Sequence, residues 1–289
     1  MAVINTNTQI YKYTITYISI EHFHNLICLK QKMDMKEEIK NQAKCMNKEQ
    51  IIELADKFET KDFIKDDPIQ FPHKYNSVQD IEISGFITAW LSFGNRKLFI
   101  RVCDKINDSF QTAGGPYKYI LGDDWKKHKD CNDTLYRWEN KKDLYNICFT
   151  LNKLYTTYPT MEEMVINNTS KFKPDNQNVY VKILYNYFSN CQKIGSKSSA
   201  CKRLHMFLRW MIRKNSPVDI GIWKKISAEY LQIPLDVHSF NTARNFGFTT
   251  ATTPSAKAVY EITNNFKNIF PDDPARGDFV LYGYDLSQK

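Results

Sequence analysis

An all-α fold is predicted for this chain, because apolar residues recur at helical spacing along most of it and strand signals are sparse after residue 30. Proline and glycine number only ten each and lie mostly between the helical runs. The spacing predicts helices over 35–59, over 79–109 with a break near Gly94, over 140–156 and over 176–190. At 42% hydrophobic content, the 289 residues can form a proper core.

The charge balance favours a polyanionic partner. Forty basic residues against 32 acidic ones give a formal net charge of +8. No apolar stretch approaches the roughly 18 residues that a membrane helix needs, so we expect no membrane partner.

The cysteines indicate a reducing compartment. Their number, seven, is odd, and no two of them form a Cys-x-x-Cys pair. The six histidines are dispersed apart from His22 and His24. We therefore expect reduced thiols, a cytoplasmic location (the nucleoid in a bacterium) and no metal.

Two parts of the chain are expected. Residues 1–45 form an N-terminal extension, and the methionines Met33, Met35 and Met46 suggest an over-long gene start. An extra N-terminal strand or tail is the equal alternative. Residues 46–289 form the helical domain.

A helix is predicted over Ala200–Arg213, with Ser199 as its N-cap and Lys202 at its third position. The positive end of the helix dipole disfavours a charged ammonium there, and a nucleophilic lysine needs a lowered pKa. The alternative is a solvated lysine on a basic helix, which is the ordinary state of a lysine.

A second helix start lies at Ile233-Pro234-Leu235-Asp236-Val237-His238, with Asp236 as the expected N-cap. A carboxylate held there can stabilise positive charge that develops on a substrate. The alternatives are a plain cap and, for His238, a surface histidine.

Pro234-Leu235-Asp236-Val237-His238 resembles the Pro-Val-Asp-x-His segment of the helix-hairpin-helix superfamily of base-excision DNA glycosylases. The similarity covers roughly residues 60–289 and is closest to 8-oxoguanine DNA glycosylase/lyases of archaeal type. The core is also similar to a bacterial family of helical proteins of unassigned function. The resemblance implies a glycosylase-like helical domain with a central cleft, a catalytic Asp236 and a nucleophilic lysine. It also implies phosphate contacts for His238.

Two lysines compete for the nucleophile's role. Lys197 lies two residues after Gly195, as in the eukaryotic Gly-x-Lys hairpin, whereas the run after Lys202 is similar to the archaeal lysine helix. We favour Lys202 on its expected helix-start position. The superfamily hairpin reads Gly-x-Gly and contacts a phosphate through backbone amides. Here only Gly195 is present.

The segment Leu91-Ser92-Phe93-Gly94-Asn95-Arg96-Lys97 breaks a helical run. It is similar to the 8-oxoguanine glycosylase segment whose asparagines fill the gap left by an extruded base, which implies DNA contacts for Asn95 and Arg96. The alternative is a glycine turn with solvated polar residues.

Asp273 and Pro274 predict the start of a last helix, on which Asp278 and Tyr282 share a face at i, i+4. Its resemblance to the last helix of those enzymes implies that Asp278 reads a guanine-type base edge and that Tyr282 stacks on the base. Met206 is expected to form the wall of the base-binding pocket opposite Tyr282. The alternative is an ordinary amphipathic helix.

The sequence therefore predicts a DNA-repair glycosylase with abasic-site lyase activity on an oxidised purine. We expect it to act as a monomer on double-stranded DNA, without a cofactor. The alternatives are a glycosylase-like protein that binds DNA without chemistry and an unrelated helical scaffold. The segment Val218–Trp223 lies between the two helices of interest and is expected to border the cleft.

Overall fold

The helices form where the apolar spacing is helical and where polar side chains cap their first turns. The structure is a computed structural model that describes residues 46–173 and 177–288. The chain divides into two compact units after Met46, and everything described below belongs to the unit Asn47–Lys289. The predicted N-terminal extension, residues 1–45, lies outside the described residues.

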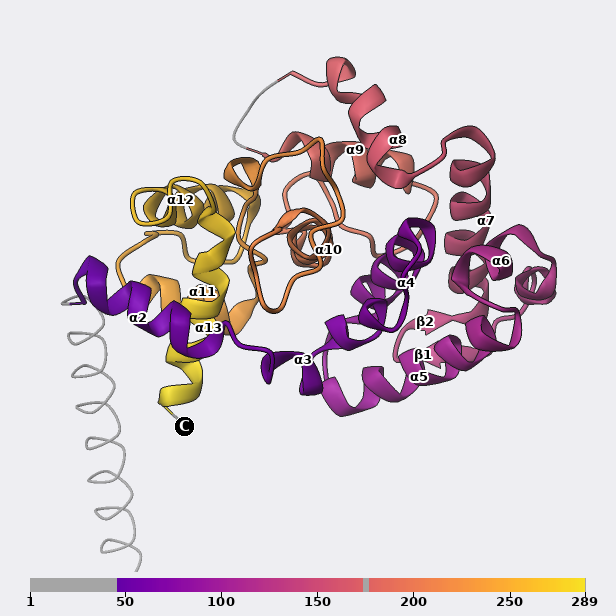
Figure 1. Ribbon diagram of the computed structural model, residues 1–289, viewed down its shortest axis with the longest axis horizontal. Helices are drawn as coiled ribbons and strands as arrows, with labels where there is room; N and C mark the ends of the chain where they lie inside the picture. The colour runs from indigo at the N-terminus through magenta and orange to yellow at the C-terminus, as the bar shows by residue number, and fades with distance from the viewer. Residues whose placement is uncertain (1–45, 174–176, 289) are drawn as a thin grey trace, which may run out of the picture. The chain divides into compact units, whose positions relative to one another are not determined.

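The described residues are mostly helical, which confirms the all-α prediction (Figure 1). The helices are α2 (Lys48–Phe58), α3 (Phe63–Asp66), α4 (Val78–Leu91), α5 (Arg96–Thr112), α6 (Pro116–Leu121), α7 (Lys141–Thr157), α8 (Met161–Asn167), α9 (Val179–Tyr187), α10 (Lys202–Ile212), α11 (Val237–Asn245), α12 (Ala256–Lys267) and α13 (Gly277–Ser287). A short antiparallel hairpin joins β1 (Thr134–Tyr136) to β2 (Glu139–Asn140), and the sequence pattern did not predict it.

Helix α4 is the centre of the core, with every residue from Ile81 to Leu91 buried. It contains a charged side chain, Glu82, which is also fully buried. The Glu82 carboxylate accepts hydrogen bonds from Trp223 Nε1 at 2.7 Å, from the Met161 amide at 2.8 Å and from the Tyr155 hydroxyl at 3.0 Å. This carboxylate therefore joins α4 to α7, to the start of α8 and to the segment after α10.

Helix α10 packs against α4 and α9, and α11 packs against α13. The first described helix, α2, lies beside the last one, α13, although they are far apart in the sequence (Figure 1). The start of α10 and the start of α11 are thus held by different groups of helices.

The predicted start of α10 is wrong. The helix begins at Lys202 and its N-cap is Cys201, which has a left-handed backbone (φ +42°) and makes no side-chain cap hydrogen bond. Ser199 instead bridges to Ser255 through its backbone. Lys202 therefore occupies the first helical position and not the third.

The predicted cap at the last helix is also wrong. Asp273 precedes a 3₁₀ turn, Pro274–Arg276, without a side-chain cap hydrogen bond. Its carboxylate binds the Arg213 guanidinium at 2.8 and 2.9 Å, because a buried cation attracts it more strongly than a backbone amide does.

Within residues 46–173 and 177–288, no helix is both long and apolar enough to span a membrane.

Candidate active site

An ion pair joins the two helix starts that the sequence singled out. Lys202 Nζ lies 3.0 Å from Asp236 Oδ2, although the residues are 34 positions apart. The other oxygen, Oδ1, accepts the Ser239 amide at 2.9 Å, so Asp236 is the N-cap of α11 as predicted. Both side chains are about one-third exposed, at 35% for Lys202 and 34% for Asp236. The pair is thus accessible and fixed by backbone capping.

The surroundings of Asp236 keep its carboxylate ionised. Burial alone would raise its pKa, but the positive charge of Lys202 and the Ser239 amide hydrogen bond outweigh burial, and the pKa lies below its usual value. Asp236 therefore supplies a fixed negative charge at neutral pH.

The pair lies in a cleft of about 600 Å³. Six of the sequence-predicted site residues line this cleft: Arg96, Gly195, Lys202, Met206, Asp236 and His238. Met206 follows Lys202 by one turn of α10 and is 8% exposed. His238 is exposed in the first turn of α11. These residues come from four separate segments, and the fold brings them to one cavity.

Gly195 lies on the wall of the cleft with φ +152°, a conformation that favours glycine. A Cβ atom there would lie 2.7 Å from Cys201 Sγ. The glycine is therefore required by the close approach of its loop to the start of α10.

Lys197 and Asn95 do not line the cleft. Lys197 is exposed, and no ion pair involves it among the described residues. Asn95 is the N-cap of α5, where its side chain accepts the Leu98 amide at 3.3 Å. Of the two rival lysines, only Lys202 has the carboxylate partner.

Asp278 does not line the cleft. Its Oδ2 atom accepts a hydrogen bond from Arg209 Nη1, and its side chain is 18% exposed. Burial raises its pKa to about 6, assisted by the negative charges of Asp236 and Asp219 and opposed by Arg209 and Lys202. Its Oδ1 atom has no hydrogen-bond partner among the described residues.

Tyr282 borders a neighbouring hollow of about 180 Å³. Its ring meets Phe58 and Phe63 edge-on, and its hydroxyl accepts a long contact of 3.5 Å from Arg96 Nη1. Arg96 lines both this hollow and the cleft, so it separates Tyr282 from Lys202.

A carboxylate that the sequence analysis missed, Asp67, faces the cleft. It is 8% exposed, caps the turn at Ile69 through a 3.0 Å hydrogen bond and forms no ion pair among the described residues. Burial raises its pKa, which Arg209, Arg96 and Lys202 oppose. Its only sequence signal was an Asp-Pro step, which is typical of a loop.

The segment Val218–Trp223 does not border the cleft, contrary to prediction. It packs along α10 through hydrogen bonds to the backbone oxygens of Trp210 and Met211. Asp219 is buried between Arg209 and Arg213. Its Oδ1 atom lies 3.2 Å from Arg209 Nε, and its Oδ2 atom contacts Arg213 Nη1 directly. Asp219 is therefore the carboxylate that these two buried cations share.

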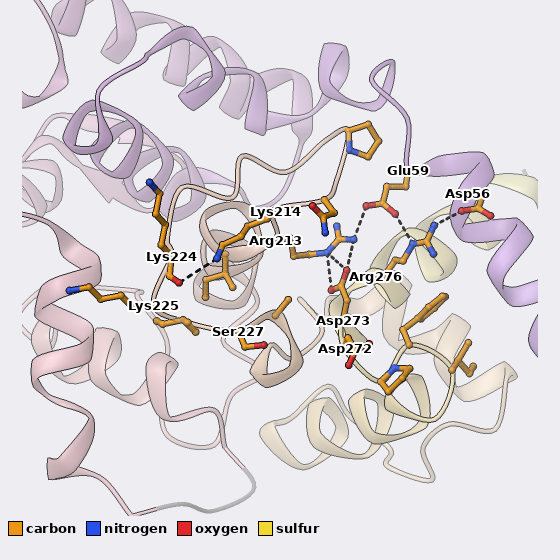
Figure 2. A pocket seen from close by; sticks show the side chains of 18 residues that line it. Asp56, Glu59, Arg213, Lys214, Lys224, Lys225, Ser227, Asp272, Asp273 and Arg276 are labelled. Atoms are coloured by element: carbon orange, nitrogen blue, oxygen red, sulfur yellow. Dashed lines mark hydrogen bonds and ion pairs between the residues drawn. The ribbon is translucent and has the colours of Figure 1, made fainter.

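Figure 2 shows how this charge network continues at the far end of α10. Arg213 binds Glu59 and Asp273, and Arg276 binds Glu59 and Asp56. The network lines a hollow of about 930 Å³. Lys202 and Arg213 are eleven residues apart on a helix, or about 16 Å, so this hollow is distinct from the cleft.

In the part of the chain that the structure describes, no group of three or more His, Cys, Asp or Glu side chains is placed to hold a metal ion.

Fold and site define a helical protein with a lysine–carboxylate pair in an open cleft. The chain belongs to the family described as "Protein of unknown function (DUF2400)", whose match extends over residues 67–287. All the residues that line the cleft fall in this range. Comparison with curated proteins and with solved structures gave no match.

Proposed function

We propose that the protein is a DNA glycosylase with abasic-site lyase activity, acting as a monomer on an oxidised purine in double-stranded DNA. The fold would then be a glycosylase-like helix-hairpin-helix domain, with α9, the loop around Gly195 and α10 as the hairpin unit. The observation that carries the proposal is the 3.0 Å pair of Lys202 and Asp236 in an accessible cleft. DNA binding alone requires neither an amine nor a carboxylate at that place.

The chemistry begins when Lys202 gives a proton to Asp236, the acceptor within reach. The neutral amine attacks the sugar carbon C1′, and the glycosidic bond breaks with its electron pair going to the base. The departing base takes up the proton that Asp236 had accepted, so the carboxylate is ionised again. Asp236 stabilises the positive charge on the sugar as the bond breaks. The substituted amine then loses its proton, the sugar ring opens to a Schiff base, and removal of a C2′ proton expels the 3′ phosphate. No cofactor is needed.

The base would occupy the space next to Met206. Asp278 does not line the cleft, so a guanine-type base would have to enter beyond the cleft wall for its N1–H and N2–H to donate to Oδ1, while Arg209 holds Oδ2. Stacking by Tyr282 requires Arg96 to turn out of the way towards a phosphate. Asn95, Gly195, Lys197 and His238 are the other proposed DNA contacts.

The deciding experiment is borohydride trapping on duplexes with 8-oxoguanine or an abasic site. The wild type and Lys197→Gln should form a covalent adduct, and Lys202→Gln should not. An adduct with Lys202→Gln but not with Lys197→Gln would transfer the nucleophile to Lys197. Tight binding without adduct or base release by the wild type would leave the alternative, a non-catalytic DNA-binding protein.

A further inference from the structure

The tip of the β1–β2 hairpin carries an unusually exposed aromatic side chain. Trp138 is 69% exposed, the highest value for any large hydrophobic residue that the structure describes. Because Tyr136 pairs with Glu139, only Arg137 and Trp138 form the turn. Arg137 takes φ +52°, which is rare for a residue other than glycine. An exposed tryptophan on a strained turn favours a role in binding.

The hairpin is anchored firmly to the loop that precedes α5. The Tyr136 hydroxyl donates to the Phe93 backbone oxygen at 2.7 Å. Gly94 has φ +76°, a conformation that favours glycine, and the end of the Arg137 side chain lies against it. The turn is therefore in contact with the loop at Gly94.

The hairpin is also anchored to the loop that precedes α10. Lys193 Nζ donates to the Trp138 backbone oxygen and lies 3.6 Å from the buried carboxylate of Glu139. Both loops that hold the hairpin contribute residues to the cleft wall. The exposed tip is thus preorganised relative to Lys202.

Aromatic and cationic groups lead from the cleft wall to this tip. Phe93 lines the cleft, and its ring is stacked with Trp138 at 6.2 Å and 14°. The Arg137 guanidinium lies 4.5 Å from the Trp138 ring, and that of Arg203 lies 5.2 Å from the Phe93 ring. The one carboxylate of the hairpin Thr134–Asn140, Glu139 in β2, is 1% exposed and presents no negative charge to a partner.

This combination matches the chemistry of nucleic acid. Each base offers a face for stacking, worth about 1–3 kcal/mol per base, and phosphates attract the neighbouring cations. Moving a base out of a duplex also leaves a gap beside its neighbours and costs a few kcal/mol.

We propose that the Arg137–Trp138 turn is a wedge that inserts Trp138 into the base stack of duplex DNA at the mouth of the cleft. The proposal rests on the proposed function for its partner, but it adds an aromatic ring that stacks on the bases, which neither the Lys202–Asp236 chemistry nor the polar side chains of Asn95 and Arg96 supply. A wedge stabilises the gap in a duplex and has no gap to fill on a single strand.

The test uses an uncleavable abasic analogue, so that it does not depend on catalysis. The analogue is placed in a duplex next to 2-aminopurine and, separately, in a single strand. Trp138→Ala should weaken binding to the duplex about 10-fold or more and reduce the 2-aminopurine fluorescence change. Binding to the single strand should change less than about 2-fold. Trp138→Phe, which keeps a ring, should recover most of the duplex affinity.

Tyr230→Ala is the matched control, since Tyr230 is another exposed aromatic residue, lines a separate hollow and should have no effect. Equal affinities of Trp138→Ala and the wild type for the duplex would overturn the wedge, as would equal losses on duplex and single strand. Absence of trapping by the wild type would refute the proposed chemistry and leave this binding result standing.

Discussion

Asp236 divides its two carboxylate oxygens between folding and the proposed chemistry. Oδ1 caps α11 and Oδ2 faces Lys202. An amide can still cap a helix, because its oxygen accepts the same hydrogen bond, but it carries no charge. Asparagine at this position therefore separates the two roles.

For Asp236→Asn we expect intact folding and DNA binding but base release slowed by about 10²-fold or more, the usual scale for a lost transition-state electrostatic contact. Single-turnover rates on an 8-oxoguanine duplex measure this. Asp236→Ala serves as comparison, because it also loses the cap and should melt earlier. Unchanged rates for the asparagine variant would rule out a catalytic role for Asp236.

The raised pKa of Asp278 predicts a pH dependence for base excision that cleavage of an abasic site does not share. With its pKa raised to about 6, its carboxyl gains a proton as the pH falls from 7 to 5, and it ceases to be a pure acceptor. Excision of 8-oxoguanine should therefore rise with pH through about 6, and cleavage of a preformed abasic site should not show this step.

Asp278→Ala should remove the step and weaken excision more than abasic cleavage, since an abasic site offers no base to read. A lost partner for a charged group costs on the order of 2–4 kcal/mol, or about 10²-fold. Equal losses on both substrates would mean that Asp278 supports the fold through Arg209.

At the scale of elements, periodicity predicted the long helices and tertiary contacts decided the rest. The break between α4 and α5 follows from Gly94, and α7 and α9 follow from their apolar stripes. The start of α10 was mispredicted, because a left-handed Cys201 and a backbone bridge from Ser199 to Ser255 depend on a distant segment. The β1–β2 hairpin is only a few residues long and is held by contacts that no local pattern reveals.

The charge network along α10 predicts a large stability effect. Asp219 is buried between Arg209 and Arg213, so its loss leaves two buried cations without their shared carboxylate. Asp219→Asn should lower the free energy of unfolding by about 3–5 kcal/mol. Asp123→Asn is the control, because its pair with Lys126 is exposed and should contribute little. Denaturant titration compares them, and matching midpoints would show that the network does not depend on Asp219.

At the scale of the whole molecule, the sequence could single out the helix starts at Lys202 and Asp236 but not the assembly of the cleft around them. The closeness of Lys202 and Asp236 was expected from the family resemblance and not from any local pattern. Asp67 lines the cleft, and the hairpin tip packs against the cleft residue Phe93, from elements with no sequence signal for either contact. Asp278 and Tyr282, although four residues apart on one helix as predicted, contact Arg209 and Arg96 respectively and do not line the cleft.

The net charge of +8 predicts that duplex binding depends steeply on salt. With about four phosphate contacts, the affinity should fall about 10²-fold between 50 and 200 mM salt, because bound phosphates release their counterions. For Lys197→Gln, a plot of the logarithm of the binding constant against the logarithm of the salt concentration should have a slope smaller in magnitude by about 0.9. This change should be the same for every DNA sequence. The variant should still form the borohydride adduct. Lys129→Gln removes the same charge from an exposed lysine outside the loop around Gly195 and outside the proposed DNA contacts, and it should leave the slope unchanged. If both variants lowered the slope equally, Lys197 would act through overall charge alone, and the phosphate contact beside Gly195 would lose its support.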